Sequence, residues 1–317
     1  MIHACLVHLS YNMWLDWDNP EYAQHSEVKR RYYAYKPYLR FDDVLWDEMV
    51  NKMAEGGVNT VLLDLGDGVR YESHPEIAVD GAWSVARLRD ELAKLRDRGI
   101  EPIPKLNFST WHDAWLGEYQ RMVSTETYYT VCRDLIAEVC ELFDTPSLFH
   151  LGWDEEFACI EDGGDMARAY RHRFSREPSM FWHDFYFFIG QVEKHSSRPW
   201  VFFDERNPGG PEAIYRKTPK SVVLTAWHYG RREAFDSSKY KIKAFHELSE
   251  FGFDQIPCGS NFSCLENYGE LVDYCQEHVR AEHLLGFLMT TWQPTIEACR
   301  ERILEALDEV ATAAAQT

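Results

Sequence analysis

Short, continuous apolar runs recur along this sequence, and each is followed by a loop and by a stretch with the apolar periodicity of a helix. There are eight such runs, at residues 4–9, 59–65, 100–107, 147–153, 200–204, 221–227, 253–258 and 284–291. A run that is apolar throughout, rather than at alternate positions, is typical of a parallel strand buried on both faces. Because strand–helix–strand crossovers are right-handed and eight units can close on themselves, the pattern predicts a (β/α)8 TIM barrel that forms a single domain over residues 1–317.

Capping residues and glycines indicate where the helices begin and end. Asp42 or Asp43 can cap a helix that ends at Gly56, and Ser84 can cap one that ends at Gly99. Further helices are expected at 125–143, 180–193, near 211, and at 241–250, 266–278 and 295–313. A doubly wound open sheet is the rival fold, but the Gly-rich phosphate-binding turn typical of it does not follow the first run.

Charge and chain composition limit the partners of this protein. A formal net charge of -19 argues against nucleic acid and anionic membranes, because both need basic patches, and it disfavours a strongly anionic substrate. No stretch of about 18 apolar residues occurs, so we expect no membrane span. The N-terminus lacks the basic head and apolar centre of a secretion signal, which favours a cytoplasmic location, although a leader removed beforehand would leave no trace.

Cysteine usage also favours a cytoplasmic location. The 8 Cys show no metal-ligand spacing, and several fall in apolar stretches, so we expect free, buried thiols in a reducing compartment. The sequence leaves the oligomeric state open, and a homo-oligomer is compatible with it. The long loops at 10–40 and 156–178 could close over a pocket or meet a partner subunit.

Polar and aromatic residues gather where the predicted strands end. In a barrel of this kind the active site lies at those carboxyl ends. The fourth run ends in three consecutive carboxylates, which are costly to bury unless they are solvated, paired or employed in chemistry. The content of 11 Trp, 17 Tyr and 18 Phe could simply be core, but such rings are also what a sugar-binding cleft needs. The ends carry Asp64, Asp67, Asn107, His112, Trp153, Asp154, Glu155, Glu156, Asp204, Trp227, Tyr229 and Trp292.

The segment His150-x-Gly152-x-Asp154-Glu155 resembles the His-x-Gly-Gly-Asp-Glu signature of the family 20 glycoside hydrolases, the β-N-acetylhexosaminidases, with Trp153 in place of the second Gly. Residues 99–104 resemble the family's "GIEVIPE" strand, and residues 286–292 resemble its closing strand, which ends in Trp. These matches come in the family's order and extend over about residues 3–312. The resemblance therefore implies a family 20 catalytic barrel.

The family resemblance also implies roles for individual residues. In this family the substrate's own acetamido group is the nucleophile of a retaining hydrolysis. Glu155 would be the general acid and later the base, with a pKa raised by Asp154 and by aromatic walls. Asp154 would bind the acetamido N–H and stabilise the oxazolinium charge. His112 and Asp67 would orient the acid, and no cofactor or metal is expected. The candidate substrate-binding residues are Trp227, Trp292, Asn107, Asp204, Tyr229, Trp153 and Glu266.

Several positions depart from the family pattern. The family's sugar-gripping Arg is missing near residues 10–12, and its Tyr after the seventh strand is matched only by residues 264–266, so that Tyr229 or Tyr268 would have to replace it. Three acidic residues of the family pattern are also replaced, by Lys105, Asn107 and Pro294. An altered sugar, a weak catalyst or a catalytically silent sugar-binding barrel would each explain these losses.

Two further expectations concern acids and metals. Glu156 has no assigned chemistry, and we expect it on the rim. A metal-dependent hydrolase is the third functional class, with a ligand set of Asp64, His112, Asp204 and His228. It is the weakest class because the sequence shows no metal-ligand spacing.

Overall fold

The computed structural model describes residues 1–25, 28–156, 176–236 and 239–316, and within these ranges eight parallel strands form one sheet. Their order is β8-β7-β6-β5-β2-β1-β10-β9, and a separate pair, β3 with β4, lies outside the sheet. The strands are β1 (Ile2–His8), β2 (Thr60–Asp64), β3 (Val69–Arg70), β4 (Trp83–Ser84), β5 (Glu101–Lys105), β6 (Leu148–His150), β7 (Arg198–Phe202), β8 (Val223–Thr225), β9 (Cys258–Ser260) and β10 (Gly286–Thr290).

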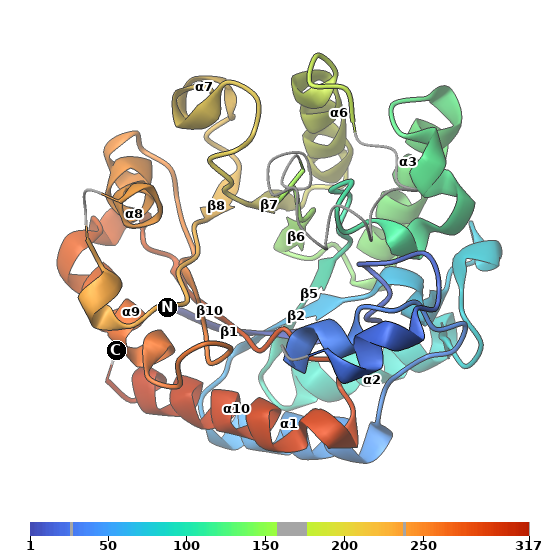
Figure 1. The fold of residues 1–317 in the computed structure, drawn as a ribbon, viewed down its shortest axis with the longest axis horizontal. Coiled ribbons are helices and arrows are strands. Elements are labelled where there is room, and N and C mark those ends of the chain that lie inside the picture. Colours follow the sequence, from blue (N-terminus) through green and yellow to red (C-terminus); the bar gives the residue numbers. More distant parts are fainter. Residues whose placement is uncertain (26–27, 157–175, 237–238, 317) are drawn as a thin grey trace.

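The sheet closes on itself between its two end strands, β8 and β9. Leu224 of β8 bridges Gln255, and Trp227 bridges Cys258. The Ile256 N–H donates to the Leu224 carbonyl at 3.1 Å, and the Cys258 N–H donates to that of Ala226 at 2.9 Å. Together with the surrounding helices, this closure confirms the (β/α)8 barrel and excludes the open sheet (Figure 1).

Bounds of the seventh barrel strand differ from the prediction. The range 253–258 is extended and bonded to both neighbours, but the regular strand β9 begins only at Cys258. Pro257 has no N–H to donate, so the ladder is interrupted immediately before Cys258. A proline inside an apolar run was the sequence signal for this displacement.

Helices surround the barrel, as Figure 1 shows. The α-helices are α1 (Asp43–Glu55), α2 (Val85–Asp97), α3 (Glu126–Leu142), α6 (Phe181–Lys194), α7 (Gly210–Lys217), α8 (Tyr240–Glu250), α9 (Asn267–His278) and α10 (Arg300–Ala314). The 3-10 helices are Pro20–Gln24, Val28–Tyr32, Gly66–Gly68, Pro75–Ile77, Ala114–Met122, Arg232–Ala234, Ala281–His283 and Glu297–Cys299.

Most predicted helix starts are confirmed, with the expected caps. The Asp42 carboxylate accepts from the N–H groups of Val44 and Leu45, and the Ser84 hydroxyl accepts from Arg87. Helix α10 begins at Arg300 rather than at residue 295, because a 3-10 turn precedes it.

Strand side chains alternate between two apolar layers. Ala4 and Leu6 of β1 lie in the cluster that fills the barrel, together with Trp200 of β7. Cys5 and Val7 point the other way, into the cluster shared with the helices. Both layers are buried, which is why consecutive positions such as Ala4–Val7 are apolar.

The other composition-based expectations are tested only in part. Seven cysteines in the described ranges are free and buried, as predicted, and Cys159 lies outside those ranges. Most of the 156–178 loop also lies outside them. In the part of the chain that the structure describes, every helix is too short or too polar to cross a membrane.

Candidate active site

A pocket lies at the carboxyl ends of the strands. Residues that follow or end six different strands line it, so the barrel geometry itself brings them together. The lining residues are Trp14, His112, Asp154, Glu155, Phe202, Trp227, Tyr229 and Trp292.

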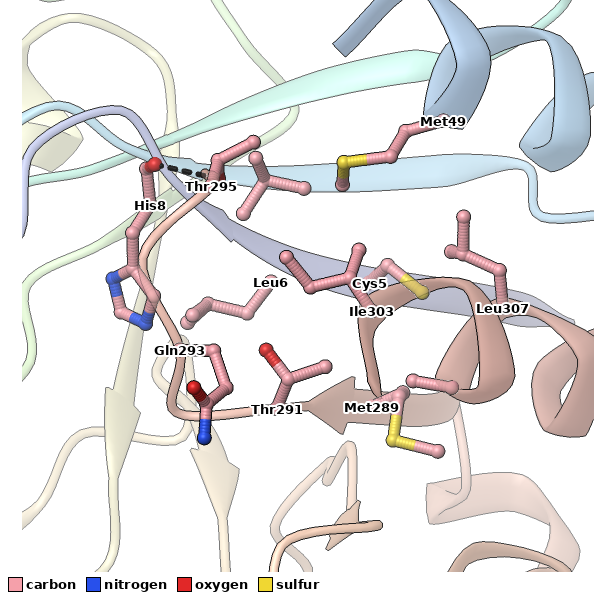
Figure 2. Close-up of a pocket in the computed structure, with 12 residues that line it drawn as sticks. Cys5, Leu6, His8, Met49, Met289, Thr291, Gln293, Thr295, Ile303 and Leu307 are labelled. Atoms are coloured by element: carbon pink, nitrogen blue, oxygen red, sulfur yellow. Dashed lines mark hydrogen bonds between the residues drawn. The ribbon is translucent and has the colours of Figure 1, made fainter. Parts of the chain in front are cut away.

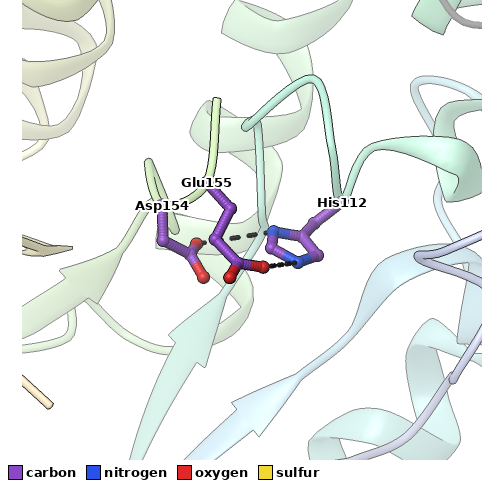
Figure 3. Close-up of side chains that lie close together, drawn as sticks. All are labelled: His112, Asp154 and Glu155. Atoms are coloured by element: carbon purple, nitrogen blue, oxygen red, sulfur yellow. Dashed lines mark ion pairs between the residues drawn. The ribbon is translucent and has the colours of Figure 1, made fainter. Parts of the chain in front are cut away.

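His112 faces both acids of the signature, one with each ring nitrogen (Figure 3). Its Nδ1 is 3.6 Å from Asp154 Oδ1, and its Nε2 is 3.5 Å from Glu155 Oε2. Burial by itself would lower the pKa of His112, but the two neighbouring carboxylates outweigh it and raise that pKa to about 9. At neutral pH the ring is therefore an imidazolium that partly neutralises the two acids.

The backbone before the acids is left-handed. Gly152 has φ 74°, and a Cβ at this position would lie 1.9 Å from Asn107 Oδ1. Glycine is therefore required here by both conformation and space. The absent side chain lets Asn107 approach closely enough for its Nδ2 to donate to Asp154 Oδ1 at 3.2 Å. Asn107 supports Asp154 and is not among the pocket-lining residues.

Asp204 and Arg206 hold the other acid. The Glu155 N–H donates to Asp204 Oδ2 at 2.7 Å, although Glu155 has an unfavourable φ of 57°. Arg206 Nη2 lies 2.9 Å from the same Asp204 oxygen and 3.3 Å from Glu155 Oε1. Asp204 is fully buried and supports Glu155 instead of lining the pocket. Arg206 was not predicted, although a cation two residues after a strand-end acid was a usable signal.

Aromatic rings form most of the pocket wall. Trp14 stacks on Tyr33 with ring centroids 4.2 Å apart, and its ring lies 4.7 Å from that of His112. Phe202 lies between Trp227 and Trp292, at 5.7 and 6.3 Å. Trp14 and Phe202 were not predicted. The aromatic content of the long loop after the first strand was the one signal for Trp14.

Of the two candidate tyrosines, Tyr229 lines the pocket and Tyr268 does not. Burial raises the pKa of the Tyr229 hydroxyl well above its ordinary value. This hydroxyl therefore stays protonated and can donate a hydrogen bond inside the pocket. Tyr268 is buried in the outer apolar layer, against the barrel wall.

Three other candidates lie away from the pocket. Trp153 is buried in the outer apolar layer, with its ring 5.3 Å from that of Phe188. Glu266 is exposed just before α9. Asp67 is buried and accepts from Asn12 Nδ2 at 3.0 Å, and burial raises its pKa to about 6. None of the three lines the pocket, so we propose no substrate contact for them.

The proposed four-residue metal set does not converge. Asp64 is paired with Lys105 at 2.6 Å and with His8 at 3.1 Å, and Asp204 is paired with Arg206. His112, Asp154 and Glu155 do offer ligand atoms within 4.8 Å of one another. A metal bound by this trio would have to displace the His112 proton, and the raised pKa of His112 opposes that exchange.

A second, small cavity lies between β1, β10 and the helices α1 and α10 (Figure 2). Its walls are mainly apolar side chains such as Met49, Ile303 and Leu307. Thr295 Oγ1 donates to the His8 carbonyl at 2.9 Å along one edge. No carboxylate lines this cavity, so it is a packing seam between layers and not the candidate site.

The fold and the pocket define a (β/α)8 barrel with an acid–imidazolium–acid cluster at its carboxyl rim. Neither a scan against protein-family models nor a search of curated proteins found a match for the sequence. Solved structures do match. The family 20 exo-β-N-acetylglucosaminidase of Vibrio harveyi has a TM-score of 0.61 and 14% identity, with 98% of this chain and 54% of that chain covered.

Two further β-N-acetylhexosaminidases give the same result. The Streptomyces coelicolor A3(2) enzyme has a TM-score of 0.62 at 12% identity, and the match covers 98% of this chain and 63% of that enzyme. The Bacteroides fragilis enzyme has a TM-score of 0.58 at 13% identity, and the match covers 97% of this chain and 66% of that enzyme. The chain thus spans between about half and two thirds of these relatives, and at such identities the likeness shows a shared barrel fold.

Proposed function

We propose that the protein is a glycoside hydrolase that releases a terminal β-linked N-acetylhexosamine, with the substrate's acetamido group as the nucleophile. One observation carries the proposal: two adjacent acids from a single strand end share an imidazolium inside an aromatic-walled pocket. The shared fold with family 20 enzymes and the sequence signature support it.

Asp154 is the group that binds the acetamido N–H. Asn107 and His112 both contact its Oδ1, which leaves Oδ2 to accept from the substrate amide. The amide carbonyl oxygen then attacks the anomeric carbon, and the positive charge of the oxazolinium forms next to the Asp154 carboxylate. The Tyr229 hydroxyl is the available donor for that carbonyl oxygen.

Glu155 is the proton donor. It protonates the glycosidic oxygen as the bond to the leaving group breaks, and then accepts a proton from the water that opens the oxazolinium ring. A Glu155 pKa raised for this role stays a prediction. Two acids from one strand end cannot flank a sugar from opposite faces, which favours the substrate's own nucleophile over a carboxylate nucleophile.

The aromatic walls bind the sugar ring. Trp227, Trp292, Trp14 and Phe202 present apolar faces to the pocket, and pyranose faces stack on such rings. We assign Trp227 and Trp292 to the walls around the sugar and its acetyl methyl group.

Turnover of aryl β-N-acetylglucosaminide and β-N-acetylgalactosaminide tests the proposal. We expect Glu155→Gln to lower kcat by about 10²–10⁴-fold, the usual contribution of a general acid–base. Glu250→Gln, on the exposed end of α8, is the matched control and should leave kcat unchanged. A thiazoline analogue of the oxazolinium should bind tightly, and failure to bind would exclude the substrate-assisted mechanism.

The ion pair between Arg206 and Glu155 favours a second candidate, a sugar-binding barrel without turnover. A guanidinium at this position stabilises the ionised carboxylate and opposes its use as an acid. If neither aryl substrate reacts but an N-acetylhexosamine raises the Tm, this binding function replaces the hydrolase.

A further inference from the structure

Glu156, directly after the acid pair, is buried and not on the rim as predicted; only 1% of it is exposed. Its Oε1 is 2.8 Å from Arg176 Nε, and its Oε2 accepts from the Thr110 N–H at 2.8 Å. The Arg176 side chain is completely buried. A buried carboxylate is costly unless it is paired and hydrogen-bonded, and here both oxygens are satisfied.

Arg176 contacts three other segments, the loops after β5 and β6 and the helix α6. Besides Glu156, it donates from Nη2 to the Phe108 carbonyl at 3.1 Å and pairs with Asp184 of α6. Its guanidinium also lies 4.7 Å from the centre of the Trp153 ring. We call Trp153, Glu156, Arg176 and Asp184 the Arg176 cluster. Two of its members, Trp153 and Glu156, directly flank the acid pair in the sequence.

The cluster begins where the backbone ladder ends. Among the described residues, the last backbone bonds between the β5 and β6 segments run from the Leu106 N–H to the His150 carbonyl and from the Phe108 N–H to the Leu151 carbonyl, both at 3.0 Å. Beyond that point side chains join the two loops. Ser109 Oγ donates to the Asp154 carbonyl, and Glu156 accepts from Thr110.

We propose that Glu156 and Arg176, with Trp153 packed on the guanidinium, are positioning residues that hold the His112 loop against the segment carrying Asp154 and Glu155. The planar guanidinium of Arg176 binds the Phe108 carbonyl in the loop after β5 and the Glu156 carboxylate in the loop after β6. Because the guanidinium is rigid, it fixes the separation of these two loops. The contribution to catalysis rests on the proposed function, but the effect on the His112 contacts does not.

The same cluster accounts for Trp153. A tryptophan at φ 73° is strained, and the sequence signature has glycine at the corresponding place. The indole packs against Phe181, Phe185 and Phe188 and covers the guanidinium. Its packing offsets the backbone strain, and it shields the ion pair from water.

Titration of the His112 ring in ¹⁵N-histidine-labelled full-length protein, followed by NMR, is the direct test. The charged or titratable groups that face this ring are Asp154 and Glu155 after β6 and His8 on β1. We compare the wild type with Glu156→Gln and Arg176→Lys. Each variant weakens the Arg176–Glu156 interaction while nearly keeping side-chain volume. The distance from His112 to Asp154 and Glu155 should therefore increase, and the titration midpoint of His112 should fall by about 1 pH unit or more.

Leu248→Ala is the matched control for lost stability, because this fully buried α8 residue lies in the core away from the cluster. It should lower the Tm and leave the His112 midpoint unchanged. Midpoints in Glu156→Gln and Arg176→Lys that equal the wild-type value would overturn the proposal. If both variants fail to fold, Trp153→Phe keeps the test open, since it exposes the guanidinium without removing the ion pair. The same fall of the midpoint is expected there, and an unchanged value would again overturn the proposal.

Kinetics separate this proposal from the proposed function. In an active enzyme, Glu156→Gln should lower kcat by about tenfold or more with little change in KM, because misplaced catalytic groups act on the transition state. A shifted His112 midpoint in a protein that hydrolyses neither aryl substrate supports positioning and refutes the hydrolase. Normal hydrolysis with an unchanged midpoint and kcat in both variants refutes positioning alone.

Discussion

Replacement of His112 by glutamine should remove a large, pH-dependent part of the folding free energy. The pKa of His112 rises from 6.5 to about 9 in the folded protein because two carboxylates face the buried ring. Each unit of difference between the folded and unfolded values corresponds to about 1.36 kcal/mol, so the protonated ring contributes about 3 kcal/mol, as an order of magnitude.

The sign of the pH dependence follows from the raised pKa. A cationic group whose folded pKa lies above its unfolded value contributes its full stability below pH 6.5 and loses it as the pH rises through about 9. The difference in unfolding free energy between wild type and His112→Gln should therefore decrease by about 3 kcal/mol from about pH 6 to about pH 9. Groups that titrate in both proteins, such as Glu309 with its pKa raised to about 8 by burial, cancel in this difference.

Urea unfolding followed by tryptophan fluorescence at several pH values measures the difference. Leu248→Ala, which changes no titratable group, is the control, and its difference from wild type should show no such trend. If the difference in unfolding free energy between wild type and variant stays constant within about 1 kcal/mol across this pH range, His112 is not protonated at neutral pH. Our account of His112, Asp154 and Glu155 would then be wrong.

Three further predictions test other parts of the site. Gly152→Ala forces a Cβ to within 1.9 Å of Asn107 Oδ1 at φ 74°, so it should destabilise the protein by about 1–3 kcal/mol and lower kcat; an unchanged Tm would contradict the geometry. Lys105→Met leaves the buried Asp64 without its 2.6 Å partner and should cost about 3–5 kcal/mol in urea unfolding, and a loss below about 1 kcal/mol would mean that the pair is unimportant. Dialysis against a chelator should leave turnover intact, whereas loss of turnover with recovery on adding Zn²⁺ would show that His112, Asp154 and Glu155 hold a metal.

Local signals in the sequence predicted most of the barrel. In the run 59–65, the consecutive residues Val61, Leu62 and Leu63 are apolar because each side chain enters one of two buried layers. Caps such as Asp42 and Ser84 act within three residues of their helices. Strand seven was displaced because Pro257 interrupts its ladder, which is again a local effect. The rim position of Asp154, Glu155 and His112 followed from strand ends alone.

What the tertiary structure decided was the role of each polar or aromatic residue near that rim. Asp204 and Asn107 lie behind the acids, Trp14 joins the pocket from a loop 98 residues before His112, and Glu156 is buried by a partner 20 residues later. The pattern of apolar residues determines which chain segments become strands, because burial depends on period and length. It does not determine which side chains meet beyond the strand ends, because those contacts join distant segments whose approach depends on the closed barrel.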